Sequence, residues 1–188
     1  MPASGGTAGG PAVKIAADGW LDGAQPLAST HCDARPPGCA IELIVIHCIS
    51  LPPGCFGGDA IERLFTGRLD PGAHPYYATL GEGRVSAHFL IRRDGALLQF
   101  VSCAQRAWHA GVSRWDGRER CNDFSIGVEL EGSEFETFTA AQYAALRSLQ
   151  DALWTAYPIR WARGHSEIAP QRKRDPGPLF DWSLVRRD

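Results

Sequence analysis

Two metal-ligand residues and a lysine lie in one short segment near the carboxyl end of the chain, GHSEIAPQRKRDPGP (164–178). His165 and Asp175 are of metal-ligand types, and Lys173 lies two residues before Asp175. A neutral imidazole and a carboxylate suit Zn²⁺, but two ligands do not complete a tetrahedral site. The segment therefore predicts a zinc site only if the chain provides a third ligand on a rigid element elsewhere.

His47 is the best candidate for that third ligand. It lies in LIVIHCIS (43–50), where an apolar and largely β-branched run predicts a strand buried on both faces. Taken singly, His47 and His165 can also be hydrogen-bonded core or surface residues, and Asp175 can be a turn cap. Taken together, three protein ligands and one open position are typical of a catalytic zinc, which makes hydroxide available at neutral pH and polarises the attacked carbonyl. The set predicts hydrolysis.

Hydrolysis at such a site also needs a group that takes a proton from water and a positive charge near the oxyanion. Glu129 lies in SIGVELE (125–131), a predicted strand in which it alternates with apolar residues. A glutamate that points inward from a buried strand costs free energy unless it has a partner or a function. Glu131 lies on the same side and is its nearest competitor. Lys173 is the predicted oxyanion stabiliser, although a loop lysine is by default a solvated one.

The elements around these residues predict an α/β fold with a single domain, a central mixed β-sheet flanked by helices. Apolar periodicity and turn signals predict a short helix within Gly57–Gly67, a long loop over 69–84, hairpin strands 85–92 and 96–101 joined at Asp94-Gly95, and a helix from the capping box Thr139-x-x-Gln142 to just before Pro158. Residues 1–14 are predicted to be a disordered extension, and 15–188 the functional domain.

Composition and charge exclude several classes of function. With 19 basic and 21 acidic residues, the chain has no basic excess for gripping nucleic acid. It has neither a secretory signal nor a long apolar stretch, so we expect a cytoplasmic protein without membrane or nucleic-acid partners. Six cysteines without a CxxC pair are expected to be free thiols, because 188 residues can form a core without disulfides. The competing possibility is a Cys32–Cys39 or a Cys48–Cys55 link.

Six co-linear blocks of the sequence resemble the AmpD-type zinc amidases, a family of N-acetylmuramoyl-L-alanine amidases. The blocks are LIVIHCISLPPG, AHPYY, VSAHFLIRRDG, RAWHAGVS, RERCNDFSIGVELEG and GHSEIAPQRKRDPGP. The resemblance runs from about Trp20 to Trp182, nearly the whole chain. It implies an Amidase_2 fold, similar to peptidoglycan-recognition domains, with a shallow groove and one Zn²⁺ per chain.

The resemblance also implies roles for individual residues. The zinc ligands of the family fall on His47, His165 and Asp175, its water-activating glutamate on Glu129, and its catalytic lysine on Lys173. Groups that contact the substrate fall on Tyr76, Arg84, Trp108 and Arg120. For these contacts there are ordinary alternatives, because the tryptophan can be core and the arginines can pair with nearby acidic residues.

Cys48 departs from the family pattern, in which many members have Asn after the strand histidine. If that Asn helps to hold substrate, affinity or preference differs here, and a thiol this near the zinc could even act as a stray ligand. His88 and His109 lie in matching blocks without being family ligands.

The resemblance implies hydrolysis of the amide between anhydro-N-acetylmuramic acid and L-alanine in recycled muropeptides in the cytoplasm. We expect the protein to be a monomer. This reaction would lower the anhydro-muropeptide pool and so restrain β-lactamase induction. One alternative is a non-catalytic peptidoglycan-recognition module, but such relatives lose zinc ligands and this sequence has all three. Another is an amidase that acts on intact cell wall, against which stand the missing signal and the recycling-type blocks RERCND and IAPQRKRDPGP.

Overall fold

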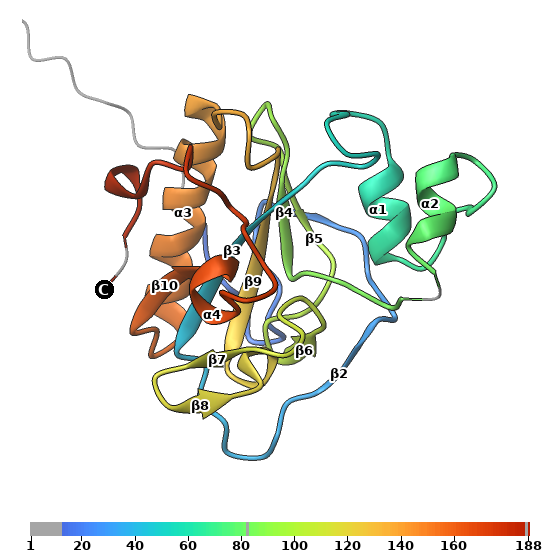
Figure 1. Ribbon diagram of the computed structural model, residues 1–188. Coiled ribbons are helices and arrows are strands. Elements are labelled where there is room, and N and C mark those ends of the chain that lie inside the picture. Colours follow the sequence, from blue (N-terminus) through green and yellow to red (C-terminus); the bar gives the residue numbers. More distant parts are fainter. Residues whose placement is uncertain (1–12, 82, 187) are drawn as a thin grey trace, which may run out of the picture.

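Two parallel apolar strands form the centre of the fold. In the computed structural model, which describes residues 13–81, 83–186 and 188, β3 (Leu43–Ile49) pairs along its whole length with β9 (Ser125–Glu131). The first four residues of β3 are fully buried, as predicted for a strand covered on both faces. Both strands lie where the sequence predicted them (Figure 1).

These strands belong to a six-stranded mixed sheet with the order β1-β5-β4-β9-β3-β10. Its other members are β1 (Gln25–Pro26), β4 (Phe89–Ile91), β5 (Leu97–Gln99) and β10 (Trp161–Gly164). β4 and β5 form the predicted antiparallel hairpin, in which Gly95 has the positive φ of 88° that the turn requires. Strands β10, β3, β9 and β4 are mutually parallel, so their carboxyl ends meet at one edge of the sheet, the usual place for a site in such folds.

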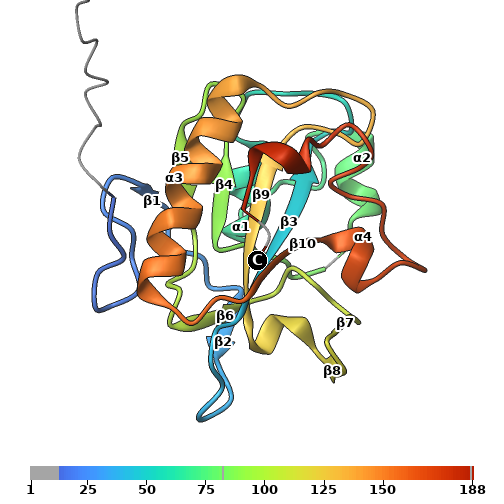
Figure 2. The ribbon, with the colours of Figure 1, turned by 90° about the vertical axis from the view of Figure 1, so that its left-hand side faces the viewer.

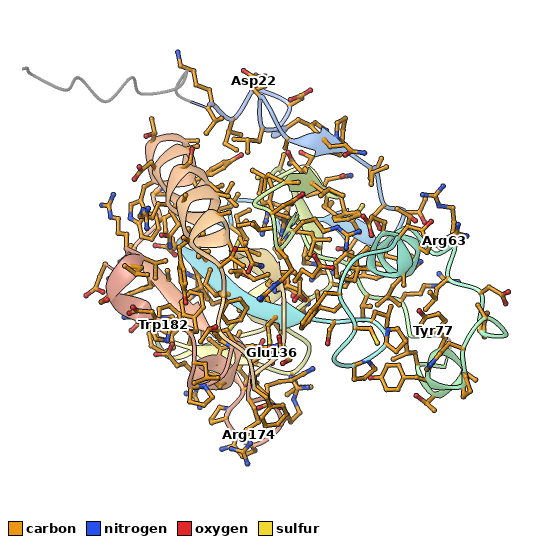
Figure 3. All side chains as sticks on the ribbon, turned by 90° about the horizontal axis from the view of Figure 1, so that it is seen from above. Asp22, Arg63, Tyr77, Glu136, Arg174 and Trp182 are labelled. Atoms are coloured by element: carbon orange, nitrogen blue, oxygen red, sulfur yellow. The ribbon has the colours of Figure 1, made fainter. Side chains whose placement is uncertain are left out.

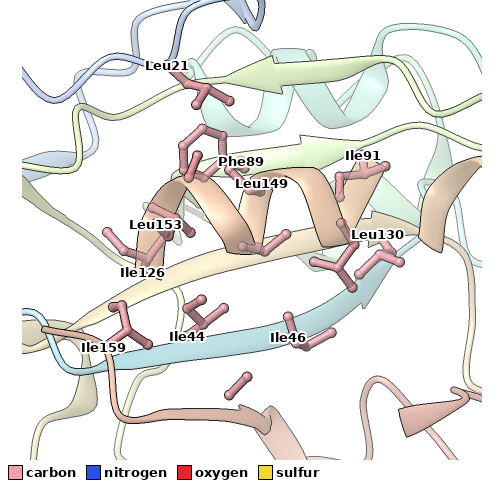
Figure 4. Packing of buried hydrophobic residues seen from close by; sticks show 14 of the residues in the cluster. Leu21, Ile44, Ile46, Phe89, Ile91, Ile126, Leu130, Leu149, Leu153 and Ile159 are labelled. Atoms are coloured by element: carbon pink, nitrogen blue, oxygen red, sulfur yellow. The ribbon is translucent and has the colours of Figure 1, made fainter. Parts of the chain in front are cut away.

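The longest helix covers one face of this sheet (Figure 2). α3 (Ala140–Ala156) starts at the predicted capping box, where the Thr139 hydroxyl accepts a hydrogen bond from the Gln142 N–H and the Gln142 side chain accepts one from the Thr139 N–H, both at 3.1 Å. Figure 4 shows the apolar cluster between helix and sheet, which includes Ile44, Ile46, Ile126, Leu130, Leu149 and Leu153. Because side chains alternate across a strand, His47 and Glu129 lie on the opposite face.

Shorter elements surround the sheet. They are α1 (Ala60–Phe65), α2 (Pro75–Thr79), α4 (His165–Ile168), the 3₁₀ turns η1 (Cys121–Asp123) and η2 (Trp182–Leu184), and two strand pairs, β2 (Cys32–Ala34) with β6 (Gln105–Ala107) and β7 (Arg114–Trp115) with β8 (Arg118–Glu119). The predicted short helix is confirmed as α1. The predicted loop over 69–84 was wrong in part, because α2 lies within it. Pro75 takes the first helical position, and the His74 ring accepts a hydrogen bond from the Tyr76 N–H at 3.1 Å.

The segment before β3 packs against the domain. Leu21 is buried in the main core, and Arg35 donates hydrogen bonds to four backbone carbonyls. These belong to Cys103 (3.1 Å), Asn122 (3.2 Å), Asp123 (2.9 Å) and Ser125 (2.9 Å). Of the predicted disordered extension, residues 1–12 lie outside the described residues. The Lys14 carbonyl accepts a hydrogen bond from the Asp22 N–H at 2.9 Å, so the ordered arm begins before residue 15.

All six cysteines are free, as predicted, and neither alternative disulfide forms. No helix in the described part of the chain combines the length and the apolar character needed to cross a bilayer. The α/β architecture with a central mixed sheet is confirmed.

Candidate metal centre and active site

Three ligand atoms converge at the carboxyl ends of β3 and β10. Gly164, the last residue of β10, pairs with Ile46, so His165 at the start of α4 comes beside His47. The two Nδ1 atoms lie 2.9 Å apart, and Oδ2 of Asp175 lies 3.0 Å from His47 Nδ1 and 3.1 Å from His165 Nδ1. Within residues 13–81, 83–186 and 188, this is the one group of side chains placed to hold a metal ion.

The donor set fits a zinc ion. Nε2 of His165 lies 3.1 Å from the carbonyl oxygen of Ala110, which can only accept a hydrogen bond. That contact places the proton on Nε2 and leaves the Nδ1 lone pair directed at the other two ligand atoms. Lone pairs this close repel one another unless a proton or a cation lies among them. Two imidazoles and one carboxylate are a typical three-residue set for catalytic Zn²⁺.

The charge states of these side chains also suit a metal. Burial lowers the pKa of His47 to about 4, although the hydrogen bond to Asp175 opposes the shift. For Asp175, burial alone would raise the pKa, but hydrogen bonds with His165 and His47 outweigh it and hold the pKa below its ordinary value. At neutral pH the site therefore presents a neutral His47 imidazole and an ionised carboxylate, the forms that bind a cation.

Glu129 lies beside His47 and on the same face of the sheet, because the two residues are paired in register. Its Oε2 is shielded from solvent and makes no hydrogen bond with any described residue. Burial first, and then the charge of Asp175, raises the pKa of Glu129 well above its ordinary value, with Lys173 acting in the opposite direction. A carboxylate without a partner and with raised proton affinity is suited to accept a proton from a reacting molecule.

Glu131, the competing carboxylate, is held in a structural network. Its Oε1 accepts hydrogen bonds from Arg92 Nη1 at 2.8 Å and from the Gly57 N–H at 2.6 Å, and its Oε2 accepts one from the Arg93 N–H at 3.1 Å. The side chain thereby joins β9 to β4 and to the loop before α1. Glu131 is buried and fully partnered, and this distinguishes it from Glu129.

Lys173 lies on the loop that leads from α4 to Asp175. Its backbone N–H donates to the Ala169 carbonyl at 3.0 Å, whereas its ammonium group makes no hydrogen bond or ion pair with the described residues. The neighbouring Arg172 fastens this loop, since its Nη2 donates to the carbonyls of Ala110 at 3.0 Å and Val112 at 2.6 Å. The result is a half-buried cation at the site that is free to meet a developing negative charge.

A cavity of about 830 Å³ contains the three ligand residues together with Glu129 and Lys173. Of the predicted substrate contacts, Tyr76 and Trp108 line it. Glu136 and Arg174, which also line it, mark two of the surrounding loops in Figure 3.

The other two predicted contacts lie elsewhere. Arg84 lines a separate cavity beside α2. Arg120 lines a cavity between the β7–β8 hairpin and the 167–172 segment, and its Nε lies 3.2 Å from Asp123 Oδ2. The structure therefore does not bring these two arginines to the ligand atoms. The pairing with an acidic neighbour that the sequence left open is present for Arg120.

Several residues at the site were given no role by sequence reasoning. His109 Nδ1 lies 2.9 Å from His47 Nε2, and Arg172 lines the cavity. The block RAWHAGVS was the available signal for His109, but a buried histidine far along the chain gives no sign of which partner it meets. Cys48 does line the cavity, and burial raises the pKa of its thiol. Its side chain packs against the apolar cluster on the α3 side of the sheet, and it is not among the three converging ligand residues.

Comparisons with known proteins agree with this geometry. The sequence matches the family Amidase_2, N-acetylmuramoyl-L-alanine amidase, over residues 37–178. It is 55% identical over 171 residues to the 1,6-anhydro-N-acetylmuramyl-L-alanine amidase AmpD of Citrobacter freundii, covering 90% of this chain and 91% of that protein.

Solved structures show the same likeness. The fold matches the crystal structure of a selenomethionine AmpD derivative with a TM-score of 0.87 and 55% identity, over 90% of this chain and 98% of that one. It also matches the E. coli N-acetylmuramyl-L-alanine amidase AmiD, solved in complex with the substrate anhydro-N-acetylmuramic acid-L-Ala-D-γ-Glu-L-Lys, with a TM-score of 0.55 and 28% identity over 92% of this chain and 63% of that one.

Proposed function

Since this chain belongs to the N-acetylmuramoyl-L-alanine amidase family and is an amidase, we propose that it hydrolyses the amide bond between 1,6-anhydro-N-acetylmuramic acid and L-alanine in muropeptides. We propose that it does so with one Zn²⁺ held by His47, His165 and Asp175. The observation that carries the proposal is the convergence of three ligand atoms within 3.1 Å in the cavity that also contains Glu129 and Lys173. A cavity of this size accommodates a small sugar and the first residues of a peptide.

The metal, when bound, supplies a Lewis acid and lowers the pKa of water. Glu129 takes the proton that water releases, because its buried Oε2 makes no hydrogen bond with any described residue and its pKa is raised. It can then deliver that proton to the amide nitrogen as the bond to L-alanine breaks. Lys173, which lines the same cavity, is in this proposal the residue whose ammonium group stabilises the negative charge that gathers on the attacked carbonyl oxygen.

The choice of substrate rests on the relatives. AmpD of Citrobacter freundii carries the anhydro-N-acetylmuramyl substrate in its name, and AmiD was solved with an anhydro-muropeptide. Tyr76 and Trp108 provide aromatic surface at the cavity wall, which is suited to packing against a sugar ring or a peptide stem. We place the substrate in the same cavity for this reason.

The biological setting is a further part of the proposal and rests on the resemblance of the sequence blocks. We place the reaction in cytoplasmic peptidoglycan recycling, carried out by a monomer, where it removes anhydro-muropeptides and restrains β-lactamase induction. Deletion of the gene should therefore raise the anhydro-muropeptide pool and β-lactamase expression together, and complementation with a Glu129→Gln variant should restore neither.

A mass-spectrometric assay on anhydro-N-acetylmuramoyl tripeptide tests the reaction itself. We expect release of the free tripeptide, loss of turnover with a chelator, and recovery with one equivalent of Zn²⁺. Binding without turnover would instead favour a recognition module. Faster release from intact sacculi than from the anhydro-muropeptide would favour an amidase of the intact cell wall.

A further inference from the structure

In each ligand imidazole, Nε2 points away from the metal site. The two Nε2 atoms contact two consecutive residues, one each. Nε2 of His165 meets the Ala110 carbonyl at 3.1 Å, and Nε2 of His47 meets Nδ1 of His109 at 2.9 Å. A carbonyl can only accept, so the tautomer of His165 is fixed by its partner. An imidazole nitrogen can donate or accept, so the tautomer of His47 depends on that of His109.

Only one arrangement of protons leaves His47 able to bind a metal through Nδ1. Its proton must then be on Nε2, and His109 must accept that proton's hydrogen bond through an unprotonated Nδ1. The proton of His109 is consequently on Nε2, which lies 3.2 Å from the Ser125 hydroxyl oxygen, an available acceptor. In the reverse arrangement, His47 would carry its proton among the three ligand atoms, where the metal binds.

The sequence makes room for this histidine. A Cβ atom added to Gly127 would lie 2.4 Å from Cγ of the His109 ring, far inside contact distance. Gly127 lies in the middle of β9, where glycine weakens a strand, and a close approach of another group is a common reason for one there. The ring of His109 therefore lies directly against the sheet, beneath His47.

The backbone of the same segment is fastened separately. Oδ1 of Asn122 accepts hydrogen bonds from the N–H groups of His109 at 3.2 Å and Ala110 at 2.8 Å. One amide side chain thereby holds both residues that contact the ligand imidazoles. Arg172 adds a second hydrogen bond to the Ala110 carbonyl, at 3.0 Å.

We infer that His109 and Ala110 form one positioning segment, which directs Nδ1 of both His47 and His165 to the metal through the side chain of the first residue and the carbonyl of the second. The inference rests on the proposed metal site, and it adds two residues that determine how tightly that site binds Zn²⁺. His109 acts through His47 and is a positioning residue, not a ligand.

Zinc affinity of two matched variants tests the inference. His109→Leu keeps most of the volume and removes the acceptor, and we expect the Zn²⁺ dissociation constant to rise by roughly 10- to 100-fold, the usual cost of losing an outer partner of a metal ligand. His109→Asn can present an amide oxygen near the position of Nδ1, and we expect its affinity to stay within about threefold of wild type. Equal losses in both variants, or no loss in His109→Leu, would overturn the inference.

A measurement on the unaltered zinc-loaded protein covers the case in which His109→Leu does not fold. Long-range ¹H–¹⁵N NMR of the imidazole rings should show both His47 and His109 protonated at Nε2, with Nδ1 of His109 free to accept the hydrogen bond of His47. A proton on Nδ1 of His109 would contradict the inference whatever the variants do. If the wild-type protein binds no Zn²⁺ in competition with a chelator, the proposed function itself fails. If it binds Zn²⁺ but His109→Leu binds equally well, only the positioning role fails.

Discussion

His47 and Glu129 are register partners on the adjacent parallel strands β3 and β9, so their side chains leave the same face of the sheet next to each other. Both therefore lie on paired strands of the central sheet, where geometry is held more precisely than on loops. Asp175 and Lys173, in contrast, lie on the loop after α4, which is fastened by Arg172. The site thus combines two residues of the sheet with two residues of a loop, and Arg172 holds that loop in place.

Replacing Glu129 with Gln should lower kcat by at least about 100-fold, because general acid-base catalysis contributes roughly 10²- to 10⁴-fold. Zinc content should stay at that of the wild type, since Glu129 is not one of the three converging ligands. Turnover of the anhydro-muropeptide and metal analysis of the same preparation would measure both. Retained turnover would show that another group takes the proton.

Replacing Glu131 with Gln should mainly affect stability. The carboxylate forms a buried pair with Arg92 at 2.8 Å, and removing one partner of such a pair costs about 3–5 kcal/mol of unfolding free energy. Urea unfolding would measure this loss, and kcat per folded molecule should stay within a few fold of wild type. A loss of kcat without a loss of stability would assign the catalytic role to Glu131.

Lys173→Ala should lower kcat by roughly 10²- to 10³-fold, the usual cost of losing a group that stabilises an oxyanion. Zinc stoichiometry should stay near one per chain. Lys14, the only other lysine in the sequence, is exposed on the N-terminal arm, and Lys14→Ala is the matched control, expected to have wild-type activity. Loss of zinc together with activity in Lys173→Ala would mean that Lys173 has a structural role.

Alanine at His47, His165 or Asp175 should abolish stoichiometric zinc binding and turnover, because two remaining side chains do not complete the site. His74→Ala is a suitable control, since His74 is exposed, caps α2 and contacts Tyr77 rather than the three ligand residues. Zinc content after dialysis against a weak chelator would measure the difference. Full retention of zinc in any of the three variants would remove that residue from the ligand set.

His88→Gln should weaken the acid sensitivity of the metal-free protein. Burial first, and then the charge of Arg35, lowers the pKa of His88 well below its ordinary value, and His109 also faces this ring. An unfolded histidine binds a proton below about pH 6.5, whereas the folded one stays neutral, so stability falls as the pH is lowered through that value. The slope of unfolding free energy against pH should be smaller in the variant, because the unfolded state then binds about one proton fewer relative to the folded state. Urea unfolding at several pH values from 5 to 7.5 checks this, and equal slopes would contradict it.

The sequence predicted those elements whose signals are local and strong. β9 has the predicted bounds, β3 is close to them, and α3 begins at the predicted capping box because its side-chain hydrogen bonds involve residues only three apart. β10 was not predicted, because its four residues, Trp161–Gly164, show only a weak alternation of apolar and polar side chains. They form a strand by pairing with β3. Its pairing is nevertheless what brings His165 to His47.

The sequence predicted the metal ligands, whose residue types alone indicate their chemistry, but not which of the proposed substrate contacts face the cavity. His47, His165 and Asp175 converge as the sequence suggested, although His47 lies 118 residues before His165 and 128 before Asp175. Arg84 and Arg120 are exposed and line other cavities, since residue type does not tell in which direction a loop presents its side chains.

Arg35 has a consequence for where the functional unit begins. The family match starts at residue 37, yet the Arg35 guanidinium satisfies four carbonyls, one of which belongs to Ser125, the residue that contacts His109. A protein shortened to the matched segment would leave those oxygens without their donor, and would loosen the start of β9 beneath the metal ligands. We therefore expect the minimal active enzyme to be longer at its amino end than the segment by which its family is recognised.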